Sequence, residues 1–175
     1  MWNTALIQYY SNTCVNKKII IGVMIALIIP IAIYTASPLF FDVVIDEPLP
    51  EITNTVTSDD TTTSAIDMPQ IIASGQFVGV NDGIHNAEGQ AKILNLADGK
   101  QLLRFEDFKA TNGPDLYVYL ATDSTAQDFV SLGELKANIG NQNYEIPEGT
   151  DISKYNTALV WCKQFSVLFG SAEIK

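Results

Sequence analysis

The sequence predicts an all-β domain, an antiparallel β-sandwich or barrel-like fold, preceded by one N-terminal transmembrane helix. The first observation behind this prediction is the uncharged apolar run Ile19–Ala36. The second is a series of short segments after Ile71 in which apolar and polar residues alternate, with turns rich in Gly, Asn and Asp between them. The chain of 175 residues has room for one anchor and one small domain.

The run Ile19–Ala36 is long enough to cross a bilayer. At 1.5 Å per residue it covers about 27 Å, close to the thickness of the hydrocarbon core. Leu39–Phe41 can extend it into the interface, so we place the anchor at residues 19–41. A cleaved signal peptide is the competing interpretation. Pro38 suits cleavage after Ala36 poorly, and the run is longer than a usual signal core.

Charges on either side of the anchor predict its orientation. Lys17 and Lys18 precede the apolar run, while Asp42 and Asp46 follow it. Lysine is retained on the cytoplasmic side. We therefore expect residues 1–18 in the cytoplasm and the rest of the chain outside, in a cell membrane that the chain crosses once.

Residues 42–70 are expected to form a linker. They are rich in Thr and Pro and contain acidic but no basic residues. Such a segment buries too little apolar area to offset the entropy of ordering. As a flexible chain it would have a root-mean-square length of about 30 Å.

The last part of the chain, residues 71–175, is expected to be the β-domain. Ala91–Leu96 and Gln101–Phe108 flank the turn Ala97–Lys100, which predicts a β-hairpin. Leu116–Leu120 alternates aliphatic with aromatic residues, as a strand does. Further strands are expected at Gly75–Val80, Leu135–Ile139, Asn143–Ile146, Thr157–Lys163 and Ser166–Ile174.

Charge and motifs exclude several functions. A net charge of −10 argues against nucleic acid as a partner, because phosphate recognition needs clustered Lys and Arg. The sequence has no G-x-S-x-G motif and no glycine-rich phosphate loop. We favour a protein that is not an enzyme, and leave open a general base built on His85 alone.

The residues expected outside the membrane restrict metal chemistry. They include one histidine, His85, one cysteine, Cys162, and Met68 in the linker. A blue-copper site needs two histidines and a cysteine, and the motifs of iron–sulfur clusters and covalent haem are missing. A non-covalent haem held by Cys162 or His85 stays open. The competing interpretation of His85 is an exposed residue of a turn-rich loop.

Carboxylates near one turn form another candidate site. Glu106, Asp107 and Asp115 could meet in space and bind calcium. The spacing is not that of an EF-hand, and the aspartate of Gly113-Pro114-Asp115 is more typical of a residue that stabilises a turn. We expect Arg104 to pair with one of these acids, as structural support.

Cys162 is the residue with the most specific chemistry. If the topology holds, Cys14 lies on the other side of the membrane, so Cys162 is a lone thiol in an oxidising compartment. It can be buried and inert, pair with another chain, or act as a redox thiol or ligand. On a strand, Val160 and Cys162 face one way and Trp161 the other, which favours an inward sulfur.

Several segments of the β-domain together carry a family resemblance. They are Gly75–Phe77, Glu88–Ala91, Leu103–Phe108, Asn112–Leu120 and Val160–Gly170. In this order they resemble the DM-thirteen domain, also called the electron-transfer DM-thirteen domain, which often accompanies DOMON domains in extracellular proteins. The resemblance implies a β-rich extracytoplasmic module with a redox role.

The resemblance also bears on individual residues. The family's characteristic cysteine corresponds to Cys162, as a bare thiol or as ligand to a cofactor such as haem. Trp161, Asp115, Arg104 and His85 are the supporting candidates. We expect electron transfer or thiol redox chemistry centred on Cys162, with a membrane or envelope redox protein as partner. The alternative is a non-enzymatic interaction module in which the cysteine is structural.

Overall fold

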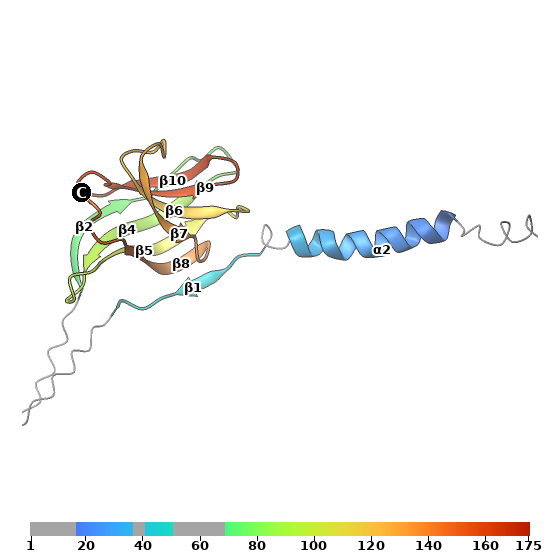
Figure 1. Cartoon of the computed structure of the whole chain (residues 1–175), viewed down its shortest axis with the longest axis horizontal. Helices are drawn as coiled ribbons and strands as arrows, with labels where there is room; N and C mark the ends of the chain where they lie inside the picture. The colour runs from blue at the N-terminus through green and yellow to red at the C-terminus, as the bar shows by residue number, and fades with distance from the viewer. Residues whose placement is uncertain (1–16, 37–40, 51–68) are drawn as a thin grey trace, which may run out of the picture. The chain divides into compact units, whose positions relative to one another are not determined.

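The computed structural model describes residues 17–36, 41–50 and 69–175 (Figure 1). The chain divides into two compact units, Met1–Phe40 and Phe41–Lys175. The first contains the helix α2 (Lys17–Ala36) and the second contains the strands. The prediction of an all-β domain preceded by one apolar helix is confirmed.

Helix α2 is apolar on every side. Its described side chains are exposed, and it continues through Pro30. It is long and apolar enough to cross a membrane, and a signal sequence near the N-terminus would have the same character. An apolar surface all round is typical of a helix that lies in lipid.

The β-domain is a sandwich of two five-stranded sheets, with orders β1-β8-β5-β4-β2 and β3-β10-β9-β6-β7. All described pairs are antiparallel except β1 with β8. The strands are β1 Val44–Asp46, β2 Gln70–Gln76, β3 Val78–Gly79, β4 Ala87–Asn95, β5 Gln101–Ala110, β6 Leu116–Ala121, β7 Phe129–Glu134, β8 Ile139–Ile146, β9 Thr157–Cys162 and β10 Val167–Glu173.

The core lies between the two sheets and is rich in aromatic rings. Alternation along β5 turns Leu103 and Phe105 inward and Arg104 outward. Phe77 meets Phe105 and Phe108 edge to face, at centroid distances of 4.9 and 5.4 Å. These contacts join the first sheet to the segment in which the chain passes from β2 to β3.

The expected hairpin is present as β4 and β5. Leu96 N–H donates to the carbonyl of Lys100 at 2.9 Å, and Gly99 has a φ of +83°, which suits glycine. The expected strand Gly75–Val80 is divided between the two sheets. Its first residues end β2 and its last form β3, since the chain turns at buried Phe77.

The expected strand Leu135–Ile139 is wrong. The strand of this region is β7, which ends at Glu134, and β8 begins at Ile139. The buried side chain of Gln142 binds both backbone groups of Ala137, accepting from its N–H at 3.1 Å and donating to its carbonyl at 2.8 Å. These side-chain bonds satisfy the backbone of the turn in place of a strand ladder.

Residues 41–50 lie against the domain, although Phe41 falls in the expected anchor and residues 42–50 in the expected linker. β1 pairs with β8, Asn138 Oδ1 accepts from Val43 N–H at 2.6 Å, and Glu47 accepts from the backbone N–H of Asn143 at 2.7 Å. We call residues 41–50 the strap. Side chains of β8 and its preceding turn hold the strap, and composition alone does not reveal such partners. Of the rest of the expected linker, residues 51–68 lie outside the described residues, and Gln70 is the first residue of β2.

Candidate functional site

Cys162 is the last residue of β9 and lies inside the sandwich. It faces Leu116 of β6 on one side and Val167 of β10 on the other. The residue is 1% exposed, and its thiol is free. Of the interpretations left open by the sequence, the inward orientation is confirmed. The sulfur belongs to the apolar core that also contains Val160.

Three loops close the sandwich at the Cys162 end. The backbone N–H of Lys163 donates to the carbonyl of Asp115 at 2.9 Å, which ties the β9–β10 turn to the β5–β6 loop. A Cβ at Gly113 would lie 2.8 Å from Leu116 Cδ2 and 2.9 Å from Phe169 Cζ. Only a residue without a side chain fits there without moving these groups. The loop therefore packs directly on the core beside Cys162.

His85 reaches this core from the β3–β4 loop. Its ring meets the buried ring of Phe169 edge to face, 4.8 Å between centroids. Its Nδ1 lies 2.6 Å from Asp82 Oδ2, and Asp82 Oδ1 accepts from the backbone N–H of His85 at 2.6 Å. The hydrogen bond from the His85 backbone is the largest cause, and the bond with the His85 ring the next, of a pKa of Asp82 well below its usual range. His85 is therefore a fixed loop residue that contacts the core around Cys162 through Phe169.

Trp161 and its neighbours line the outer face of the second sheet. Trp161 lies opposite Tyr117 across the β9–β6 pair, and Lys163 Nζ sits 4.7 Å above the Tyr117 ring. Tyr119 stacks on Phe129 at 4.1 Å with an interplanar angle of 19°. The pKa of Tyr119 is raised, mainly because its side chain is buried. We call this set, Tyr117, Tyr119, Phe129 and Trp161, the aromatic face.

Arg104 lies on the outer side of the other sheet and is 4% exposed. Its Nε donates to Glu106 Oε1 at 2.8 Å, and its Nη1 donates to Asn143 Oδ1 at 2.8 Å and to the carbonyl of Glu47 at 3.0 Å. The expected pairing of Arg104 with a nearby acid is confirmed. Arg104 holds the strap through its bond to Glu47 and is not part of the environment of Cys162.

Glu106 shows why this cluster is structural. Burial raises the pKa of Glu106, but hydrogen bonds from Lys92 and Arg104 outweigh it and lower the pKa overall. Two cations thus occupy this carboxylate. Among residues 17–36, 41–50 and 69–175, no group of three His, Cys, Asp or Glu side chains is arranged to hold a metal ion. The candidate calcium site considered from the sequence, made of Glu106, Asp107 and Asp115, is therefore not formed.

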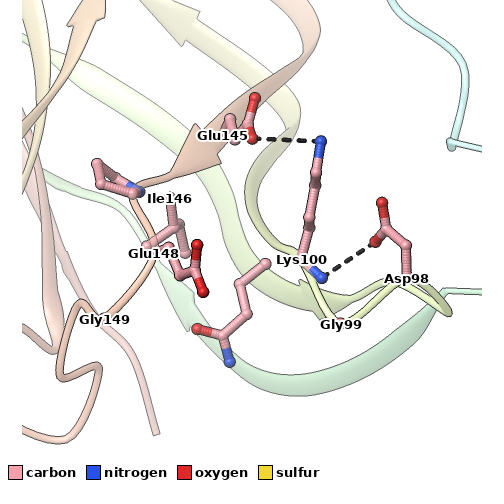
Figure 2. A pocket seen from close by; sticks show the side chains of 9 residues that line it. Asp98, Gly99, Lys100, Glu145, Ile146, Glu148 and Gly149 are labelled. Atoms are coloured by element: carbon pink, nitrogen blue, oxygen red, sulfur yellow. Dashed lines mark hydrogen bonds and ion pairs between the residues drawn. The ribbon is translucent and has the colours of Figure 1, made fainter.

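A haem on Cys162 does not fit the packing. Cys162 is buried in the same core as its strand partners Leu116 and Val167 and as Val160, and a macrocycle would have to displace core side chains. The pocket in Figure 2, about 320 Å³, is elsewhere. Asp98–Gln101 and Glu145–Gly149 line it, and Lys100 Nζ lies 3.6 Å from Glu145 Oε1 across it. The pocket lies at the opposite end of the sandwich, where the β4–β5 turn meets the end of β8.

Sequence reasoning located Cys162 and Trp161 but missed the environment that Phe129 and Phe169 create. Phe129 begins a strand that the sequence did not predict, and Phe169 was expected only as part of a strand. The alternation of Tyr117 and Tyr119 with buried Leu116, Val118 and Leu120 was the signal for an outward aromatic row.

Comparison with known protein families gives a match. A family model described as electron transfer DM13 matches residues 76–174, which span β3 to β10 and include Cys162. Neither a curated protein nor a solved structure matches the chain.

Proposed function

The chain belongs to the electron transfer DM13 family, and from this premise we propose that its β-domain transfers electrons with Cys162 as the redox group. The single observation behind the choice of residue is that Cys162 is the free cysteine of the matched domain, placed at the end of a strand next to three closing loops. A thiol there can become accessible when these loops move, without separation of the two sheets.

The chemistry that suits a lone thiol is exchange with a disulfide of a partner protein. The thiolate of Cys162 attacks one partner sulfur, the partner's S–S bond breaks, and the other sulfur leaves as a thiolate. A mixed disulfide joins the two chains. A thiolate of a second protein, a dithiol protein, then attacks the Cys162 sulfur, and the first partner leaves with both of its sulfurs reduced. The second thiol of the dithiol protein next releases Cys162 as a thiolate and closes a disulfide within the dithiol protein. Two electrons have then passed from the dithiol protein to the first partner, and the domain has returned to its starting state.

Burial imposes a condition on this reaction. At 1% exposure Cys162 cannot meet a partner sulfur in the closed structure. The reaction therefore needs local opening of the β9–β10 turn and the 111–115 loop, which costs less than global unfolding. Opening at this end breaks few backbone bonds, among them that of Lys163 with Asp115.

The test is to trap the mixed disulfide. Cells with full-length protein carrying Cys14→Ser are quenched with acid and alkylated, and adducts are resolved without reductant. We expect a reductant-sensitive adduct that disappears in Cys14→Ser/Cys162→Ala and persists in Cys14→Ser/Trp161→Phe. Absence of any adduct in the Cys14→Ser parent would overturn the exchange mechanism.

We also propose a place for the domain. In this proposal helix α2 is an uncleaved anchor, with Lys17 and Lys18 on the cytoplasmic side and the β-domain outside. Support comes from the apolar helix and from the charge difference across it. Protease added to intact cells should remove the domain from the outer surface, and full protection would overturn this orientation.

A second candidate function is a non-enzymatic interaction module of the envelope. The full burial of Cys162 favours it, since a buried cysteine can act as a small apolar side chain. The aromatic face offers a contact surface, with half-buried Trp161 and Tyr117 and with Phe129 42% exposed. Full biological activity of Cys162→Ala, combined with its loss in Trp161→Ala, would select this function over the first.

A further inference from the structure

Exposed apolar side chains gather at the Cys162 end of the β-domain. Phe41 is 66% exposed, Ile84 71% and Phe165 63%. Val43 and Val80, 55% and 43% exposed, lie beside them in the chain. We call these five residues the apolar tip.

Backbone and side-chain bonds show that the segments carrying the apolar tip share one end. Asn112 Nδ2 donates to the carbonyl of Phe41 at 3.4 Å, which joins the start of the strap to the 111–115 loop. The neighbouring Thr111 exchanges bonds with Asn86, at the end of the loop that carries Ile84. Asp115 of the same loop binds Lys163, which begins the turn that carries Phe165.

The loops at the opposite end have a different character. Residues 96–100, 122–128 and 147–156 contain no exposed large apolar side chain among those described. They contain the carboxylates Asp98, Asp123, Asp128, Glu148 and Asp151. Exposed apolar side chains outside these loops also lie toward the opposite end, at Ile71, Ile72 and Phe129, and the segments of the apolar tip carry Asp42, Asp82 and Asp115. Single exposed apolar residues are ordinary on a protein surface, but five gathered on neighbouring loops at one end indicate a contact surface.

Chain connectivity identifies what the apolar tip contacts. The tip begins at Phe41, and only residues 37–40 separate Phe41 from Ala36, the last residue of α2. Phenylalanine, isoleucine and valine favour burial at the boundary between headgroups and acyl chains. We propose that the apolar tip inserts into the interface of the bilayer that α2 crosses. This inference rests on the proposed membrane anchor and not on the redox role.

The consequence is a defined orientation for the redox residue. Cys162 lies at the same end as Ile84 and Phe165, so the tip would direct the sulfur toward the membrane surface. A membrane-embedded partner could then reach it, whereas the pocket of Figure 2 would face away from the lipid.

The experiment uses the full chain in phosphatidylcholine nanodiscs, with Cys14→Ser and Cys162→Ala as background. Single cysteines replace Ile84 or Phe165 in the tip, and exposed Ser124 or Glu148 at the opposite end. Ile25→Cys reports on the anchor. Each cysteine carries an environment-sensitive fluorophore, and quenching by spin-labelled lipid is measured.

We expect the labels at 84 and 165 to be quenched several-fold more than those at 124 and 148, with the label at 25 quenched most. Quenching at 25 with equal, weak signals at the other four positions would overturn the inference and leave the redox proposal standing. Absence of quenching at 25 would overturn the anchor and the tip together.

Discussion

Cys162 lies directly opposite Leu116 in the antiparallel pairing of β9 with β6. Both residues are buried, and both sit where their strands meet the closing loops. The position of the sulfur is therefore set by the sheet, whereas its access to solvent depends on side chains and loops. Substitutions at different positions can separate these two contributions.

Leu116→Ala should open space beside the sulfur. Loss of a buried leucine costs about 2–5 kcal/mol of stability, since the site collapses only in part. We expect the thiol of Cys162 to react with a disulfide reagent at least ten-fold faster than in the parent. Val118→Ala is the matched control, because Val118 lies in the same core two positions along β6, opposite Val160. Equal acceleration in both variants, after correction for stability, would contradict a local route to Cys162.

Cys162→Ser and Cys162→Ala should differ in stability. Serine places a hydroxyl in an apolar core, and an unsatisfied buried hydroxyl costs about 1–3 kcal/mol. Alanine removes the sulfur without adding a polar group and should be the more stable of the two. Urea unfolding of the full chain measures both, with Cys14→Ser as parent. A serine variant as stable as the parent would show that position 162 has a polar partner.

Acid should release the strap. Burial raises the pKa of Glu47, but its bonds to Lys136 and Asn143 outweigh burial, so the folded-state pKa is below the ordinary 4.5. A lowered pKa means that ionised Glu47 stabilises the folded state above pH 4.5 and that this contribution is lost as the pH falls through the folded-state pKa. After correction for intrinsic exchange rates, the hydrogen-exchange protection of residues 44–47 should fall over this range. In Glu47→Gln the amides of the strap should exchange faster at neutral pH, and their protection should lose most of its dependence on pH. A pH profile of exchange equal to that of the parent would contradict this role of Glu47.

Arg104→Met should loosen the strap more than Lys92→Met. Arg104 binds the carbonyl of Glu47 as well as Glu106, whereas Lys92 binds Glu106. Removing one member of a buried charged pair costs about 3–5 kcal/mol, and this cost should be smaller here because Glu106 keeps Lys92. Hydrogen exchange at residues 44–47 distinguishes the variants. Similar exchange in both would show that Arg104 does not hold the strap.

The sequence predicted those features that depend on local pattern. The apolar run gave α2, the Asp98-Gly99 turn gave the β4–β5 hairpin, and alternation placed Cys162 inside and Trp161 outside. Each depends on residues that are near one another in the chain, so periodicity and turn chemistry suffice.

Features that depend on distant partners were missed. The strap has an acidic, Pro-containing sequence and is ordered by Asn138, Asn143 and Arg104, which lie far along the chain. The turn at 135–138 was assigned to a strand because the bonds from Gln142 to Ala137 leave no local signal. The closing of the Cys162 end by Gly113 and Phe169 likewise requires the two sheets to be in place.

The most direct test of the central claim compares two free energies in the Cys14→Ser protein. The first is the free energy of opening that exposes Cys162, obtained from its rate of reaction with a thiol reagent without denaturant. The second is the free energy of global unfolding, obtained from urea denaturation. If Cys162 is a redox residue reached by local opening, the free energy of opening should be well below the free energy of global unfolding. Equality of the two values would mean that Cys162 is exposed only when the domain unfolds, and would contradict its role as the redox group.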